Sequence, residues 1–159
     1  MKAHAAVSLA LSAVALASCG GRKSVEINPD VQPVASRWNG VLATPPELAG
    51  IVQVRGQAWM GPDEKSLDRT QAHVDISNAV PGGQHPWHVH RGQCGSDKGI
   101  LGPADAYPPL KVEGDGHAKA TATLPIAYPK TGEFFVKVHA SSKNMSTIVA
   151  CGNLAPPAR

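Results

Sequence analysis

Two histidines, His88 and His90, stand two positions apart in the segment 85–94. Residues two apart on a β-strand share a face, so both imidazoles would project together while Val89 points to the other side. Imidazole nitrogen is a ligand for copper, zinc, iron and nickel. The spacing therefore predicts half of a metal site, although solvated surface histidines would show the same pattern.

A third candidate ligand, His139, ends the apolar segment 134–139. It has the opposite parity to Val136 and Val138, so it points out of the core if the valines point in. By the same argument the two histidines beside Val89 lie on the outer side of their strand. We expect the three imidazoles on the outer surface, where a metal could sit between the barrel and its loops.

The first 18 residues predict a targeting segment. Lys2 precedes a short apolar run, 5–16, which is too short to span a bilayer comfortably and ends in small residues. Its close at 16–19 resembles the bacterial lipobox, so Cys19 is the expected lipidation site; an ordinary signal peptide is the alternative. Because Gly20 follows rather than an aspartate, the resemblance implies an outer-membrane lipoprotein of the cell envelope, facing the periplasm.

The remaining chain is expected to hold a tether and one domain. Residues 19–36 would form the lipidated N-terminus and a flexible tether, and residues 37–159 the folded domain. With Cys19 assigned to a lipid, Cys94 and Cys151 remain. An exported chain meets an oxidising compartment, where an even pair predicts a disulfide. A thiolate metal site is the alternative, but neither cysteine has a C-x-x-C partner.

The expected elements are short strands. We expect strands at 51–59, 72–76, 118–124, 134–139 and 148–151, with Gly- and Pro-containing turns between them, and a long loop at 95–109. This pattern predicts an all-β fold, an antiparallel β-barrel or sandwich. The formal charge is only +3 and no basic run occurs, so the composition gives no support for nucleic-acid binding.

These motifs together resemble the copper/zinc superoxide dismutases. The segment 82–90 is similar to the G-x-H-G-F-H-V-H strand of that family, 138–139 to its V-H strand, 150–152 to its A-C-G close, and 109–116 to its L-P-x-L…D-G stretch. The resemblance covers about 41–154. It implies a Greek-key β-barrel of the superoxide dismutase type, anchored to a membrane by its N-terminal lipid.

The resemblance also implies roles for individual residues. His88, His90 and His139 would be the ligands of one copper per chain and thereby the catalytic residues, with His85 supporting them. Cys94 and Cys151 match the intrasubunit disulfide of the family. Superoxide would be the substrate, converted to oxygen and hydrogen peroxide.

Several family positions differ in this chain. The bridging and zinc histidines of the family fall in a stretch matched by 95–115, which contains no histidine, and Ala106 replaces the zinc aspartate. Ile148 replaces the active-site arginine, and the segment between His139 and Cys151 is shortened. We therefore expect copper without zinc, and slower dismutation than in the family.

Other candidates and functions stay open. His73 and His117 are expected to be bystanders, and Met145 is a weaker alternative soft ligand. If zinc does bind, Asp97, Asp105 and His117 are the ligands to examine. The alternative functions are a non-enzymatic periplasmic copper-binding or copper-delivery lipoprotein, and a metal-free interaction module on the same fold. The sequence does not predict the oligomeric state.

Overall fold

The computed structural model describes residues 37–157, and this part of the chain is almost entirely β-structure. The targeting segment, the tether and Cys19 lie outside the described residues. Within 37–157 no helix is long and apolar enough to cross a membrane. The all-β prediction is confirmed.

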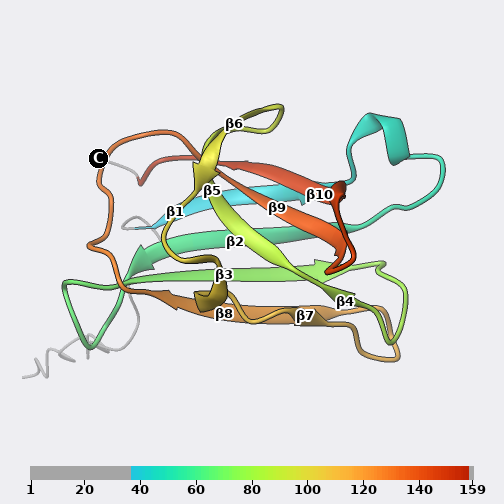
Figure 1. The fold of residues 1–159 in the computed structure, drawn as a ribbon, viewed down its shortest axis with the longest axis horizontal. Coiled ribbons are helices and arrows are strands. Elements are labelled where there is room, and N and C mark those ends of the chain that lie inside the picture. The colour runs from blue at the N-terminus through green and yellow to red at the C-terminus, as the bar shows by residue number, and fades with distance from the viewer. Residues whose placement is uncertain (1–36, 158–159) are drawn as a thin grey trace, which may run out of the picture.

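Ten strands and two 3-10 turns make up the described chain (Figure 1). In order they are β1 (Trp38–Ala43), η2 (Pro46–Leu48), β2 (Arg55–Pro62), β3 (Thr70–Ser77), β4 (Gln84–His85), β5 (Trp87–Gln93), β6 (Ser96–Ile100), η3 (Ala104–Ala106), β7 (Leu110–Lys111), β8 (Ala118–Leu124), β9 (Phe134–Ser141) and β10 (Asn144–Leu154).

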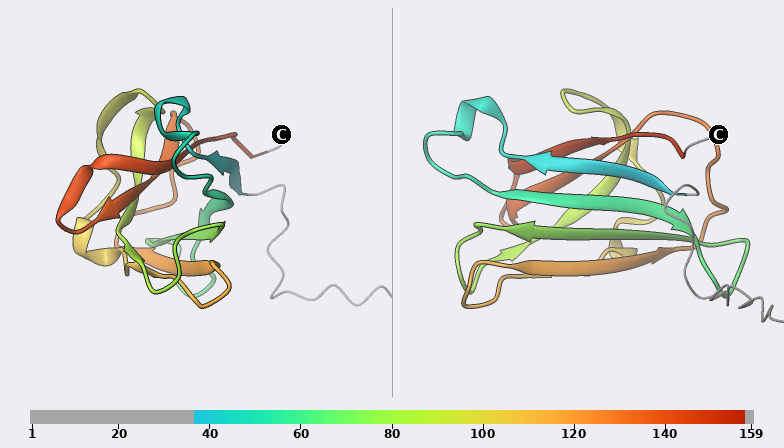
Figure 2. Two further views of the ribbon diagram at one scale, coloured as in Figure 1. Left: turned by 90° about the vertical axis from the view of Figure 1, so that its right-hand side faces the viewer. Right: turned by 180° about the vertical axis from the view of Figure 1, so that it is seen from behind.

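Eight of these strands form one antiparallel sheet in the order β6-β5-β9-β10-β1-β2-β3-β8, and β4 pairs with β7. The sheet curls on itself into a half-barrel, as the end-on view in Figure 2 shows. The neighbours β3 and β8, β5 and β9, and β1 and β10 are far apart in sequence. Such crossovers are those of Greek-key topology, which brings β5 and β9 side by side.

The concave side of the sheet holds the hydrophobic core. Val89 of β5 and Val136 and Val138 of β9 are buried in it, as their parity predicts. The alternation predicted for 118–124 also matches β8, in which Ala118, Ala122 and Leu124 are buried. The outer side of β5 and β9 is therefore free to carry other side chains.

The predicted strand 51–59 begins four residues late. Residues 51–54 lie outside β2, because the backbone N–H groups of Ile51 and Val52 both donate to the Leu48 carbonyl after η2. These bonds fix a turn and leave the Ile51 side chain 81% exposed. The apolar, β-branched start of the segment was therefore a misleading strand signal.

The predicted loop 95–109 is wrong at its start, where β6 forms a hairpin with β5. Glycines make this hairpin possible: Gly92 has a φ of +103°, and a Cβ there would collide with the Ser96 carbonyl. The register places Gly92 opposite Asp97. The hairpin therefore folds back along β5 and brings Asp97 toward His90.

A disulfide joins Cys94 and Cys151, as predicted. Its sulfur atoms are 2.03 Å apart, and 57 residues separate the two cysteines in the sequence. Cys94 lies at the turn of the β5–β6 hairpin, and Cys151 lies in β10 opposite Ala43 of β1. The bond therefore fastens the hairpin to the middle of the sheet.

Candidate metal centre

Three histidines converge on the outer side of two neighbouring strands. His88 and His90 come from β5, and His139 comes from β9, which pairs directly with β5. Each offers one ring nitrogen, and these nitrogens lie within 4.8 Å of one another. The structure thus brings together the three histidines that the sequence proposed as ligands, close enough to bind one metal ion.

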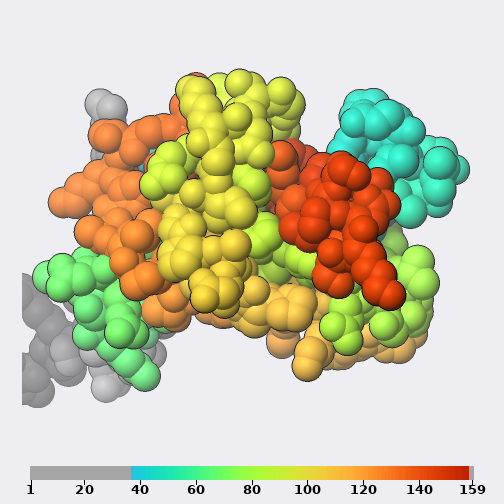
Figure 3. Space-filling model, in the orientation of Figure 1, coloured from blue at the N-terminus to red at the C-terminus, as the bar shows by residue number. Residues whose placement is uncertain are grey.

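The three histidines are buried, which corrects the expectation that they lie on an outer surface. Their exposed fractions are 6% for His88, 5% for His90 and 6% for His139. The Tyr107 ring covers His88 at 5.2 Å between centroids, and the Phe135 ring lies 5.3 Å from His90. In Figure 3 the yellow segment containing β6 and η3 and the red start of β10 flank a narrow strip of β5. Parity predicted the side of the strand but not the segments that cover it.

Hydrogen bonds fix the protonated nitrogen of two of the rings. His90 Nδ1 donates to Asp97 Oδ1 at 3.0 Å, and His139 Nδ1 donates to the Met145 carbonyl at 2.6 Å. Both acceptors lack a proton to give, so both rings carry hydrogen on Nδ1 when neutral. Each Nε2 is then a lone-pair donor, as a metal ligand requires.

The free nitrogens face one another across the cluster. His88 Nδ1 lies 3.4 Å from His139 Nε2, which is long for a hydrogen bond. His90 Nε2 is buried and has no hydrogen-bond partner among the described residues. A buried polar atom without a partner is costly, and a metal ion bound between the rings would satisfy it. The side chains present therefore fit a metal with imidazole ligands.

Burial keeps these imidazoles neutral. Desolvation, together with the neighbouring His139 and His90, lowers the pKa of His88 to about 4. Desolvation also lowers the pKa of His90, although its hydrogen bond to Asp97 raises it, and desolvation lowers the pKa of His139, although its hydrogen bond to the Met145 carbonyl raises it. Neutral rings at neutral pH leave their lone pairs available to a metal.

His85 lies beside this cluster and holds the backbone of one member. Its Nδ1 donates to the His139 carbonyl at 2.9 Å, while the His139 N–H donates to the Pro86 carbonyl at 2.8 Å. Both bonds come from the short segment before β5. They fix the backbone of His139 from two sides.

A groove of about 670 Å³ opens beside the cluster. Its lining includes Lys137, Ile148 and both cysteines of the disulfide. Ile148 pairs with His139 between β10 and β9. The position at which the family resemblance leads one to expect an arginine therefore lies at the groove, next to a candidate ligand, and its side chain carries no charge.

The remaining candidates lie elsewhere. Among the residues described, His88, His90 and His139 are the one group of three or more His, Cys, Asp or Glu side chains close enough to share a metal. His73 stacks on Trp59 and contacts the Thr121 hydroxyl, and His117 is exposed. Met145 contributes its backbone carbonyl to the site.

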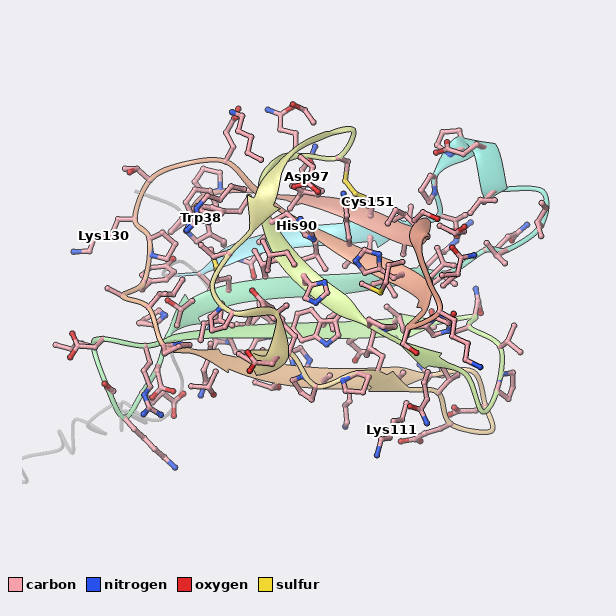
Figure 4. The ribbon with its side chains drawn as sticks, in the orientation of Figure 1. Trp38, His90, Asp97, Lys111, Lys130 and Cys151 are labelled. Atoms are coloured by element: carbon pink, nitrogen blue, oxygen red, sulfur yellow. A yellow bond between two sulfur atoms is a disulfide. The ribbon has the colours of Figure 1, made fainter. Side chains whose placement is uncertain are left out.

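Sequence reasoning missed the role of Asp97, which it considered only as a zinc ligand. Asp97 Oδ1 accepts from His90, which lies beside it in Figure 4. Asp97 Oδ2 accepts from Lys137 Nζ at 2.6 Å. The bond from the Lys137 ammonium is the main reason that the pKa of Asp97 lies below its usual range. The glycines at 92 and 95 signal a hairpin that could have placed this carboxylate beside β5.

Comparison with models of known protein families finds no match to this chain, and comparison with curated proteins finds none either. The arguments for its function therefore rest on the histidine cluster and its surroundings.

Proposed function

We propose that this protein is a copper-binding, superoxide dismutase-like protein of the cell envelope, which converts superoxide to oxygen and hydrogen peroxide. The observation that carries the proposal is the cluster of three buried, neutral imidazoles with free nitrogens within 4.8 Å. The motifs around these histidines and the confirmed disulfide support the family resemblance.

The donor set fits copper but does not by itself select it. Three imidazoles also hold zinc in catalytic sites, in which a water completes the coordination. Zinc has no redox chemistry, whereas dismutation needs a metal that alternates between two oxidation states. Copper is therefore the metal that suits both this ligand set and the proposed reaction.

Bound copper would supply the electron acceptor for one superoxide ion and the electron donor for the next. His88, His90 and His139 would hold it in place. Because these rings are almost completely buried, only small molecules would reach the bound metal. Two protons are needed for each hydrogen peroxide formed, and without a bridging histidine in 95–115 the solvent must provide them. Ile148 provides no cation to attract the anion, so we expect a rate below that of the family.

The test is a rate measurement on copper-loaded protein. Purified mature protein is loaded with copper, its copper content is determined, and superoxide decay is followed by pulse radiolysis. We expect decay faster than the free-solution background, and loss of the copper-dependent rate in His139→Ala. Copper held in the site without any rate above that variant would contradict the enzyme.

A copper-delivery lipoprotein is the second candidate, and the apolar part of the groove favours it. A carrier needs a site that a partner can reach but needs no cation to steer an anion. Ile148 and the disulfide give the groove an apolar part beside His139. Stoichiometric copper binding without dismutation would favour this candidate. If the protein binds no copper, the metal-free interaction module remains as the alternative function.

A further inference from the structure

Asp97 and Lys137 form a chain of hydrogen bonds that ends on one proposed ligand. The carboxylate accepts from His90 Nδ1 at 3.0 Å and from Lys137 Nζ at 2.6 Å. The Gly99 backbone N–H donates to the same Oδ1 at 2.7 Å. Both oxygens of the carboxylate are thus engaged, and its position relative to His90 is determined from two elements, β6 and β9.

The lysine is itself held in place. The Lys137 side chain is only 19% exposed, and its ammonium lies 5.5 Å from the centre of the Phe135 ring. Lys137 faces His88 across the β5–β9 ladder, on the side that carries the histidines. Its ammonium therefore reaches Asp97 over the outer side of the sheet, next to the cluster.

We propose that Asp97, held by Lys137, is the positioning residue that keeps His90 protonated on Nδ1 and its Nε2 free for the metal. The inference rests on the proposed metal function of the three histidines. A neutral imidazole carries one ring proton, and the tautomer with hydrogen on Nε2 cannot bind a metal through that atom. Partners of this kind, outside the ligands themselves, typically change metal affinity 10- to 100-fold.

The two possible roles of Lys137 predict changes of opposite sign. A lysine acting only as a nearby positive charge would repel a metal cation, so Lys137→Met would strengthen metal binding. A lysine that holds Asp97 in position has the contrary effect, because its loss frees the carboxylate to leave His90. We expect Lys137→Met to weaken binding, by less than the loss of Asp97 itself.

The first experiment needs no metal. Nitrogen-15 NMR of the histidine rings in the metal-free protein reports which nitrogen of His90 is protonated. We expect Nδ1 in the wild type and a substantial Nε2-protonated population in Asp97→Ala. His139 is the internal control, because its Nδ1 bonds to the Met145 carbonyl and should not change. A wild-type His90 protonated on Nε2 would overturn the proposal without any variant, whether or not copper binds.

The second experiment measures copper affinity by competition with a chelator. We expect Asp97→Ala to bind copper 10- to 100-fold more weakly than the wild type. Asp68→Ala, which removes an exposed carboxylate between β2 and β3, should change affinity less than twofold. On the Asp97→Ala background, Lys137→Met should cause no further loss, since the lysine acts through the carboxylate.

Two results would overturn the inference while leaving the metal site standing. One is unchanged copper affinity and His90 tautomer in Asp97→Ala. The other is tighter copper binding in Lys137→Met, which would make Lys137 a repelling charge. Failure of the wild type to bind copper would instead contradict the proposed function, and the metal-free NMR result would still decide the tautomer.

Discussion

At the scale of single residues, burial of the three imidazoles links the stability of the metal-free protein to pH. The unfolded chain has histidines with ordinary pKa values, whereas burial lowers the pKa of His88 to about 4 in the folded state. Between these values the unfolded state binds more protons than the folded state. The stabilisation is therefore complete above about pH 6.5 and is lost as the pH falls toward 4.

We predict that the free energy of unfolding of the metal-free protein falls between pH 7 and pH 4.5. The lowering of the His88 pKa from its ordinary value to about 4 corresponds to a few kcal/mol of free energy of unfolding, at roughly 1.4 kcal/mol per pKa unit. Urea denaturation at the two pH values measures the difference, which should be smaller in His88→Asn. His117→Gln, which removes an exposed histidine, is the control; equal pH dependence in all three proteins would rule out this linkage.

Ile148 offers a second prediction at this scale. Ile148→Arg should increase the superoxide dismutation rate of the copper-loaded protein by up to about tenfold, because a cation in the groove beside His139 would attract the anion. The increase should diminish as added salt screens the charge. Pulse radiolysis at several ionic strengths measures it.

The matched control is Leu67→Arg, which adds the same charge at an 86% exposed position between β2 and β3. It should give a smaller increase. An equal increase in both variants would show that net charge, rather than the groove, governs the rate.

At the scale of elements, the disulfide fastens the β5–β6 hairpin to β10. Closing a loop of 57 residues restricts the unfolded chain, and native disulfides typically contribute about 2–4 kcal/mol. We predict that Cys94→Ser/Cys151→Ser loses free energy of unfolding by this amount in urea denaturation. Mass mapping of the exported wild type should find the two cysteines joined; two free thiols would contradict the bond.

The strands that could be predicted are those in which one face meets the core. In β8 the buried and exposed residues alternate as the sequence predicts, because small apolar side chains recur at every second position. In β9 the apolar residues Phe134, Val136 and Val138 also recur at every second position, but the opposite face is buried as well. β6 lacks this signal, because Ser96–Ile100 is polar and largely exposed and is held by its backbone pairing with β5. The sequence analysis missed β1 as well. Its Gly40 lets the backbone approach the Asn153 carbonyl closely, and such a contact leaves no alternating pattern in the sequence.

The candidate site was predictable to a similar extent. The spacing of His88 and His90 and the parity of His139 predicted the three candidate ligands, because the alternation of side chains along a strand can be read from the local sequence. Their burial was not predictable, since Tyr107 reaches His88 from an aperiodic loop. The bond from His90 to Asp97 depends on the turn of a hairpin, for which the glycines were the only sequence signal.

At the scale of the whole molecule, the single histidine cluster of the described residues predicts one metal ion per chain. We predict one copper and no stoichiometric zinc per chain after exposure of the metal-free protein to both ions and removal of the excess. Three imidazoles form the one cluster found in 37–157, and the stretch 95–115 has no histidine for a second site. Elemental analysis gives both ratios; equimolar zinc beside copper would contradict the prediction.

Anchoring is also a property of the whole molecule, and it depends on a residue outside the described part. We predict that Cys19→Ala moves the protein from the membrane fraction to the soluble fraction of the cell envelope, because the lipidated cysteine would be the anchor. Fractionation followed by immunodetection measures this. A wild type found only in the soluble fraction would favour an ordinary signal peptide.

The pairing of β5 with β9 determines when during folding a complete site can exist. His88 and His139 are 51 residues apart in the sequence, and they meet only when β5 pairs with β9. A growing or half-folded chain in which the two strands have not paired offers only the two histidines of β5. The three-histidine site thus depends on a long-range pairing, and a metal that requires all three histidines would bind only chains in which β5 and β9 have paired.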